Sequence, residues 1–295
     1  MNINPYVMLI RPANIITAIS DILAGSAIAG YLVELCTPSI SKLILLILST
    51  SCLYAGGIVF NDVFDIDIDR SERPERPLPN GEISLKNAQI FGVTLFILGV
   101  LFSFFVQFES GIIAFLISLM ALIYDRYTKD YLVIGSLNMG FCRGLNLMLG
   151  MSILPRIIYS NVIWICIIPI IFIAAITLTS KGEVLGNNKS AIFMALFLDI
   201  TVTGILLGIA MLGWLDIWMA APFILFWIGM NVKAKLKAII KNNPEFIKMV
   251  VKMGVLSLIP LNASFVAGFG HWILGLCTLI LLPISIALAK RFSVT

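Results

Sequence analysis

Acidic and basic side chains are concentrated in residues 61–84, which read NDVFDIDIDRSERPERPLPNGEIS. Asp62, Asp65 and Asp69 are spaced i, i+3 and i+7, so on a helix they share one face, with Asn61 beside them. Three carboxylates on one face repel each other unless they share a hard cation. Oxygen ligands suit Mg²⁺, which is usually held by one or two carboxylates together with substrate phosphates. The spacing therefore predicts a Mg²⁺ site with Asn61, Asp62, Asp65 and Asp69 as ligands.

Three arginines follow directly, at positions 70, 73 and 76. A guanidinium presents paired N–H donors that match phosphate oxygens. An acidic face followed by arginines predicts a site for a diphosphate and a metal ion. Asp67 is expected to point away from the acidic face.

Further polar groups occur inside or directly after apolar segments. Tyr124 and Lys129 follow the fourth apolar run; Lys129 is a compact cation suited to a phosphate, and Tyr124 can donate beside it, although a solvated loop is the alternative interpretation. Arg143 lies within the fifth run, where a charge costs about 2.5–3.5 kcal/mol on insertion scales and is a functional candidate by default. The structural alternative is an ion pair with Asp199 or with a carboxylate of the 61–86 loop.

A second polar loop, TSKGEVLGNNK at 179–189, lies one half-chain beyond the acidic loop and contains Lys181 and Glu183. The two loops follow the same two-span rhythm, which predicts that they share a cytoplasmic pocket. Asn14, Asp21 and Asn262 are polar groups within apolar runs, and each could simply cap or cross-link helices.

The composition indicates an integral membrane protein. Hydrophobic residues make up 60% of the 295 residues and charged residues 12%, whereas soluble domains are about 45–50% apolar and about 25% charged. The net charge of +4 does not point to a nucleic-acid partner, because the basic residues lie where membrane topology requires them. The five cysteines show no CxxC spacing, so neither a disulfide framework nor a cysteine metal site is expected.

The chain is predicted to be a single all-α membrane domain, residues 1–295, with nine or ten transmembrane helices. A spanning helix needs about 20 apolar residues, and we count ten such runs, at about 14–33, 43–60, 87–107, 110–124, 133–154, 161–179, 190–213, 216–231, 249–268 and 272–289.

The positive charges are distributed unevenly between the predicted loops. All of the 20 lysines and arginines except Lys42, Arg143 and Arg156 fall at the termini or in alternate loops, and the positive-inside rule makes that side cytoplasmic. With ten spans, both termini are then cytoplasmic. The basic stretch 232–248 is interpreted as an anchor at the lipid headgroups, with a lid over a cytoplasmic site as the alternative.

The acidic motif resembles that of the UbiA superfamily of intramembrane aromatic prenyltransferases. The resemblance is carried by Asn61-Asp62-x-x-Asp65-x-x-x-Asp69-Arg70 and by Arg73-Pro74-x-Arg76-Pro77. Supporting matches are Arg11-Pro12 with Asn14, Tyr124 with Lys129, and Gly135 to Asn138 followed by Arg143-Gly144. The resemblance extends from the N-terminus to about residue 150.

The resemblance implies a multi-pass protein of the cell membrane that transfers a polyprenyl group from its diphosphate to a lipophilic, aromatic acceptor on the cytoplasmic side, with Mg²⁺. It implies catalytic roles for Asp62, Asp65, Asp69 and Glu183. The residues that it assigns to the diphosphate are Asn14, Arg70, Tyr124, Lys129, Arg143 and Lys181.

The second Asp-rich motif of the family is altered in this chain. Glu183 and Asn187 stand where an Asp pair is expected, which predicts a weakened second metal site. This form resembles a divergent, EboC-like branch, in which some members are described as transporters of a secondary-metabolite precursor. The alternative function is therefore a carrier that kept the diphosphate site without turnover. A transporter needs polar groups through the midplane, and the one-sided charge distribution favours the enzyme.

Overall fold

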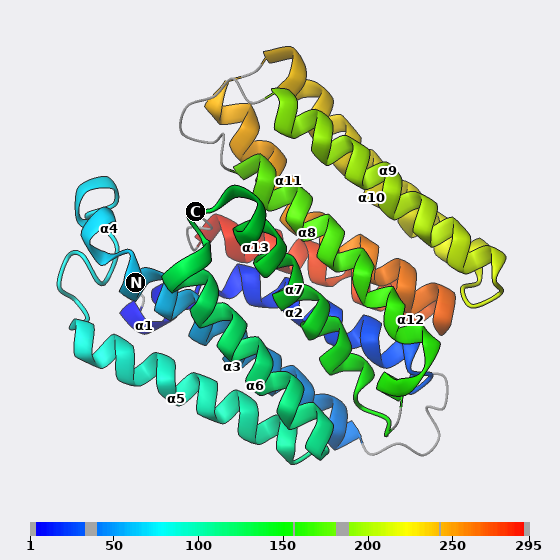
Figure 1. Ribbon diagram of the computed structural model, residues 1–295, viewed down its shortest axis with the longest axis horizontal. Helices are drawn as coiled ribbons and strands as arrows, with labels where there is room; N and C mark the ends of the chain where they lie inside the picture. The colour runs from blue at the N-terminus through cyan, green and yellow to red at the C-terminus, as the bar shows by residue number, and fades with distance from the viewer. Residues whose placement is uncertain (1–3, 33–39, 156, 181–188, 242, 292–295) are drawn as a thin grey trace.

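The computed structural model describes residues 4–32, 40–155, 157–180, 189–241 and 243–291. Every regular element in these ranges is helical. The helices lie side by side in a bundle with their long axes in roughly one direction (Figure 1). They are α1 (Pro5–Leu9), α2 (Pro12–Ile28), α3 (Ile40–Phe64), α4 (Ile66–Glu72), α5 (Leu85–Phe104), α6 (Phe108–Ile123), α7 (Leu132–Met151), α8 (Ile167–Ser180), α9 (Lys189–Met211), α10 (Ile217–Lys241), α11 (Pro244–Phe269), α12 (Trp272–Leu279) and α13 (Leu281–Arg291).

Within the described residues, nine helical segments are long and apolar enough to cross a membrane. The first predicted span forms α2, which has 17 residues and is shorter than the others. The start of α1 and the end of α13 lie at the same end of the bundle as α4 (Figure 1). An even number of crossings returns a chain to its starting side, so α2 and the nine longer segments together agree with ten crossings. The predicted all-α, multi-pass architecture is confirmed.

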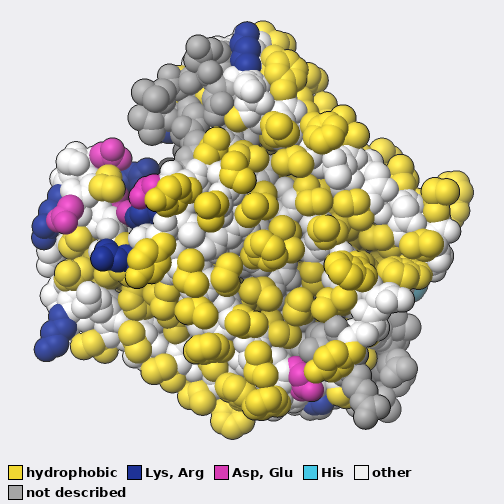
Figure 2. Space-filling model, viewed as in Figure 1, with side chains coloured by type: hydrophobic (Ala, Val, Ile, Leu, Met, Phe, Trp, Pro, Cys, Tyr) yellow, Lys and Arg dark blue, Asp and Glu magenta, His cyan; other side chains and the backbone are white. Residues whose placement is uncertain are grey.

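The outer surface has the pattern of a membrane protein. Hydrophobic side chains cover most of the face in Figure 2, and charged side chains gather mainly at the edge around α4. Large apolar side chains such as Phe105, Phe197 and Trp218 are exposed. Exposure of this kind is unfavourable in water and favourable in lipid.

Helices α2, α7 and α11 form the interior of the bundle. α2 packs against α3, α7, α11 and α13, and α11 has the largest buried share among the candidate spans. Small residues allow the closest approaches, as membrane helices require without a hydrophobic driving force. An added Cβ at Gly25 of α2 would lie 2.3 Å from the Leu147 carbonyl oxygen, and one at Gly150 of α7 would lie 2.7 Å from the Ile22 carbonyl oxygen.

The α2–α7 contact leads to a stability prediction. Gly25→Ala is expected to lower the free energy of unfolding by about 1–3 kcal/mol, because the added methyl group meets backbone atoms that cannot rotate away. Titration with SDS in mixed micelles measures this change. Gly208→Ala on α9 is the matched control, because a Cβ there meets nothing within 4 Å, and it should be neutral or stabilising. Equal destabilisation by both substitutions would contradict the packing argument.

The basic stretch 232–248 is helical on both sides of residue 242. It contributes to the end of α10 and the start of α11, both of which extend well beyond the predicted apolar runs. Lys235 in this stretch is buried, and its Nζ lies 2.5 Å from Asp199 Oδ2 on α9. The stretch is therefore part of two long packed helices, and its roles as an anchor at the headgroups or as a lid stay predictions.

Candidate active site

The acidic motif begins in the last turn of α3. Helix α3 ends at Phe64, and α4 begins after Asp65. The predicted continuous helical face is therefore interrupted at Asp65. Asp62 and Asp69 are buried, and both contact Arg76, whose Nη1 lies 3.4 Å from Asp62 Oδ1 and 2.6 Å from Asp69 Oδ2. The break allows α4 to turn away while Arg76 joins the two carboxylates.

Each carboxylate of the motif has a cationic partner. Asp62 also accepts a hydrogen bond from Arg11, at the start of α2, and Asp65 accepts one from Lys129. Asp69 Oδ1 also lies 3.8 Å from Arg73 Nη1. In the described ranges, no group of three or more His, Cys, Asp or Glu side chains is arranged to hold a metal ion. The carboxylates of the motif are paired with arginine and lysine in this structure, and the role of Asn61, Asp62, Asp65 and Asp69 as metal ligands stays a prediction.

A carboxylate that the sequence reasoning did not single out completes this region. Asp125 is buried, and it accepts a 3.1 Å hydrogen bond from Asn61 Nδ2, which also donates to Asp65 over 3.2 Å. Residues Tyr124–Thr128 form a π-helical turn after α6, a rare geometry that is frequent at functional sites. The signal in the sequence was an aspartate directly between Tyr124 and the basic loop.

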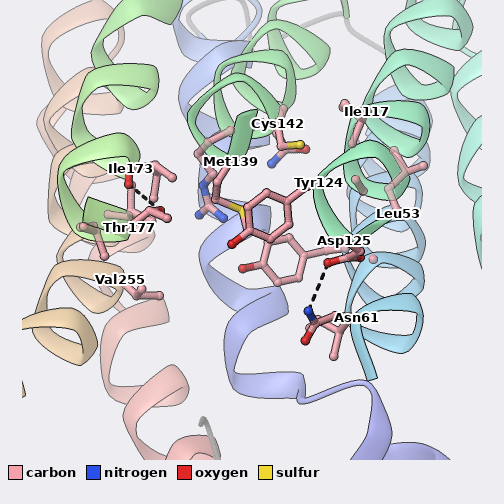
Figure 3. Close-up of a pocket in the computed structure, with 18 of the residues that line it drawn as sticks. Leu53, Asn61, Ile117, Tyr124, Asp125, Met139, Cys142, Ile173, Thr177 and Val255 are labelled. Carbon is pink, nitrogen blue, oxygen red and sulfur yellow. Dashed lines mark hydrogen bonds between the residues drawn. The ribbon is translucent and has the colours of Figure 1, made fainter. Parts of the chain in front are cut away.

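These polar groups border a cavity of about 370 Å³ enclosed by α3, α6, α7, α8 and α11. Figure 3 shows Asn61 hydrogen-bonded to Asp125, with Tyr124 directed into the cavity beside Met139. Leu53 and Ile117 form one apolar wall, and Ile173 and Val255 another. We define the mouth of the cavity by the lining residues Arg11, Asn61, Tyr124 and Asp125, by Asp62 and Asp65, which bond to Arg11 and Asn61, and by Arg76 and Lys129, which bond to those two aspartates.

Arg143 also lines this cavity. It lies on α7, deeper in the bundle than the mouth. Its Nε lies 2.6 Å from Asp21 Oδ2 on α2. The structural alternative expected for Arg143, an ion-pair partner, is present, but the partner is Asp21 and neither Asp199, which pairs with Lys235, nor a carboxylate of the 61–86 loop. Asn262 on α11 donates to Asp21 Oδ1 over 2.6 Å. The expectation that Asp21 and Asn262 cross-link helices is confirmed.

Two other predicted site residues, Arg70 and Asn14, do not line the larger cavity. Arg70 is 62% exposed and pairs with Asp67, which is 87% exposed and points off the acidic face as expected. Asn14 lines a separate cavity of about 110 Å³ that shares Tyr54 with the larger one. Glu183, Lys181 and Asn187 lie outside the described residues. Arg76, one of the three arginines predicted to reach phosphate oxygens, and Arg11, noted only as part of a motif, lie at the mouth, whereas Arg70 does not.

The sequence model of the UbiA prenyltransferase family matches residues 23–250, which is most of the chain. The chain belongs to the UbiA prenyltransferase family. This confirms the family resemblance, whereas nothing in the comparisons addresses the EboC-like branch.

Several curated relatives of this UbiA-family chain are digeranylgeranylglyceryl phosphate synthases. The protein from Sulfurisphaera tokodaii is 30% identical over 185 residues, which are 61% of this chain and 63% of the relative. The protein from Methanosphaera stadtmanae is 30% identical over 151 residues, 50% of this chain and 52% of the relative. The chain thus matches between about half and two thirds of these relatives' length.

Solved structures share the fold over nearly the whole chain. A structure of digeranylgeranylglyceryl phosphate synthase in membranes is 25% identical, with a TM-score of 0.66, and covers 90% of this chain and 97% of its own. A UbiA homologue from Archaeoglobus fulgidus, bound to GPP and Mg²⁺, is 16% identical with a TM-score of 0.53. The match covers 97% of this chain and 98% of the homologue. The second likeness shows the fold alone.

Proposed function

We propose that this protein is a membrane prenyltransferase that moves a polyprenyl group from its diphosphate to a lipophilic acceptor. The observation that carries the proposal is the cavity, which has a mouth of cations and carboxylates and apolar walls of bilayer-spanning helices. Such a site holds a charged head at one end and a hydrocarbon tail at the other. Family membership supports this activity.

The diphosphate is proposed to bind at the mouth, to Arg11, Arg76 and Lys129, with Tyr124 donating beside them. Arg11 and Arg76 offer paired donors, and Lys129 a compact charge. All three are held in place by carboxylates of the acidic motif. Lys181 and Asn14 stay predictions for the same group, and Arg70 is proposed to act only as an exposed partner of Asp67.

The donor set at the mouth fits Mg²⁺. Asn61 joins Asp65 and Asp125 through hydrogen bonds, so these side chains offer oxygen ligands at one place. An ion that also binds substrate phosphates needs only one or two protein carboxylates. Asp65 and Asp125 would hold it, with Asp62 adjacent. Bound Mg²⁺ supplies charge stabilisation to the departing diphosphate.

The transfer breaks the bond between C1 of the prenyl chain and the diphosphate oxygen, which keeps the electron pair. The arginines and Lys129 stabilise the negative charge that develops on this leaving group. An acceptor oxygen or carbon forms the new bond to C1 and loses one proton, for which Glu183 stays the predicted base. Leu53 and Ile117 line the space for the tail and exclude water, which would otherwise capture the allylic cation.

For the acceptor we propose a glyceryl phosphate lipid. The relatives' name states a product that carries two geranylgeranyl groups on glyceryl phosphate. One transfer to a geranylgeranylglyceryl phosphate gives that product. An aromatic acceptor, expected from the family resemblance, is the other candidate. We further propose that the mouth and both termini face the cytoplasm, as the positive-inside rule predicts.

The roles of two arginines give a kinetic prediction. Arg11→Gln is expected to raise the KM for geranylgeranyl diphosphate at least about tenfold, because hydrogen bonds to charged groups contribute about 1.5–3 kcal/mol. Arg70→Ala should change it less than about threefold, since exposed ion pairs contribute about 0–1 kcal/mol. Initial rates at varied donor concentration measure both. A larger effect of Arg70→Ala would place the diphosphate on the outer face of α4.

The proposed function is tested by release of inorganic diphosphate from the full chain in lipid nanodiscs. The protein receives geranylgeranyl diphosphate and Mg²⁺, with either geranylgeranylglyceryl phosphate or 4-hydroxybenzoate as the acceptor, beside an Asp65→Ala control. We expect release that requires Mg²⁺, is stimulated by the glyceryl phosphate lipid and is lost in the control. Stimulation only by 4-hydroxybenzoate would identify an aromatic acceptor. Binding of the diphosphate without release would support the carrier instead.

A further inference from the structure

Arg143 is the cationic side chain of the cavity that the proposed diphosphate site does not use. It is 5% exposed, lies on α7, and its Cζ is 5.7 Å from the centre of the Tyr54 ring. Tyr54 precedes Asn61 by seven residues on α3, which corresponds to a depth of about 10 Å below the mouth. The cavity therefore contains cationic groups at two depths.

The Arg143 guanidinium is not satisfied by its ion pair. Nε and Nη2 are buried, and neither donates a hydrogen bond of acceptable geometry to a described residue. Asp21 balances the charge, but its oxygens already accept hydrogen bonds from Asn146, over 2.8 Å, and from Asn262, over 2.6 Å. Buried N–H groups are nearly always paired, and a guanidinium has five of them. Because Arg143 itself lines the cavity and pairs with Asp21 through Nε, the geometry favours a ligand acceptor beside the rest of the guanidinium.

Asp21 and the Tyr54 ring hold the Arg143 guanidinium in position, and hydrogen bonds between the helices fix its surroundings. Asn146, one turn along α7, donates to the Ala18 carbonyl oxygen over 3.0 Å and accepts from Thr50 over 2.7 Å. These bonds tie α2, α3 and α7 together around the guanidinium. A donor group fixed in this way is preorganised, because binding need not order a flexible side chain.

We propose that Arg143 binds the oxyanion of the acceptor substrate, and that the diphosphate does not reach it. This proposal rests on the proposed function. The two substrates of a transfer each bring a polar head, and the nucleophile must lie next to C1, just inside the diphosphate. A phosphate monoester on a glyceryl lipid, or a carboxylate on an aromatic ring, matches the planar fork of a guanidinium. Arg143 then determines which acceptors are used, while the mouth determines the donor.

The test separates binding of the two substrates. The variant is Asp21→Asn with Arg143→Gln, which removes both charges together and leaves neither buried alone. Equilibrium binding to protein in nanodiscs is measured for four probes: geranylgeranyl diphosphate with Mg²⁺, geranylgeranylglyceryl phosphate, its dephosphorylated alcohol, and 4-hydroxybenzoate. Lys129→Gln is the matched control at the mouth. Thermal unfolding of each protein shows whether it remains folded.

We expect the double variant to raise the Kd of the glyceryl phosphate lipid at least tenfold and that of the diphosphate less than threefold. It should also lose the preference for the phosphate over the alcohol. Lys129→Gln should show the opposite pattern. If only 4-hydroxybenzoate shows the dependence on Arg143, the proposal holds with a carboxylate as the oxyanion.

Two results would overturn the proposal: a loss of diphosphate binding as large as the loss of acceptor binding, or unchanged binding of every probe by a folded double variant. Because the measurement is of binding, it is independent of turnover. Arg143-dependent acceptor binding in a protein that releases no diphosphate would uphold this site and reject the proposed function. Diphosphate release by a protein whose acceptor binding does not depend on Arg143 would uphold the proposed function and reject this site.

Discussion

Asp62→Asn is expected to reduce the rate of diphosphate release by at least about a hundredfold, a loss typical of removing one preorganised electrostatic group. The substitution keeps the size of the side chain but removes the charge that holds Arg11 and Arg76 in place. Both arginines are proposed to bind the leaving group. The loss should therefore appear in kcat as well as in the KM of the donor. Steady-state rates in nanodiscs measure both.

Asp67→Asn is the matched control for this substitution. Asp67 belongs to the same motif but is 87% exposed, and its ion-pair partner is the exposed Arg70. Because exposed pairs contribute little, we expect a rate within about twofold of the wild type. A rate above one third of the wild type in Asp62→Asn would contradict the proposed role of the buried carboxylate.

Asp21→Ala is expected to lower the free energy of unfolding by about 3–5 kcal/mol, the usual cost of breaking a buried ion pair by removing one partner. Asp21 is fully buried, and the side chains around it come from α2, α7 and α11. Its removal leaves the Arg143 charge without compensation and the Asn146 and Asn262 amides each short of an acceptor. SDS titration in mixed micelles measures the change.

Adding Arg143→Met to Asp21→Ala should restore more than half of the lost stability, because an apolar pair often replaces a buried ion pair at little cost. The double variant should still fail to bind the acceptor lipid. If the double variant is no more stable than Asp21→Ala alone, the amides, and not the unpaired charge, account for the loss.

The close approaches between helices show why this polar cluster can exist inside a membrane protein. Gly25 and Gly150 bring the α2 and α7 backbones together next to the pair between Asp21 and Arg143. The contact brings Asn146 within 3.0 Å of the Ala18 carbonyl oxygen. Polar groups that would be costly in lipid are therefore satisfied by neighbouring helices.

The sequence by itself determined the membrane class, the helical architecture and the family. These properties depend on local features: apolar runs of bilayer length, and a motif whose residues are close together in the chain. Asp62 and Asp69 were identified as one unit for the same reason, and the structure joins both to Arg76, only fourteen and seven residues away. Spacing along one or two helical turns is a reliable guide to proximity.

The tertiary structure alone decided which charges meet across helices. Arg143 pairs with Asp21, which is 122 positions away in the chain, and Asp199 pairs with Lys235. The sequence alone does not distinguish Asp21 from Asp199 as the partner of Arg143. Likewise, Asn61 reaches Asp125 only because α3 and the turn after α6 lie side by side. Arg70 and Arg76 both follow the acidic face in the sequence. In the structure the Arg70 side chain on α4 is exposed, whereas the Arg76 side chain is buried against Asp62 and Asp69. The physical reason is that ion pairing depends on distance in space, and helix packing sets that distance for residues far apart in the chain.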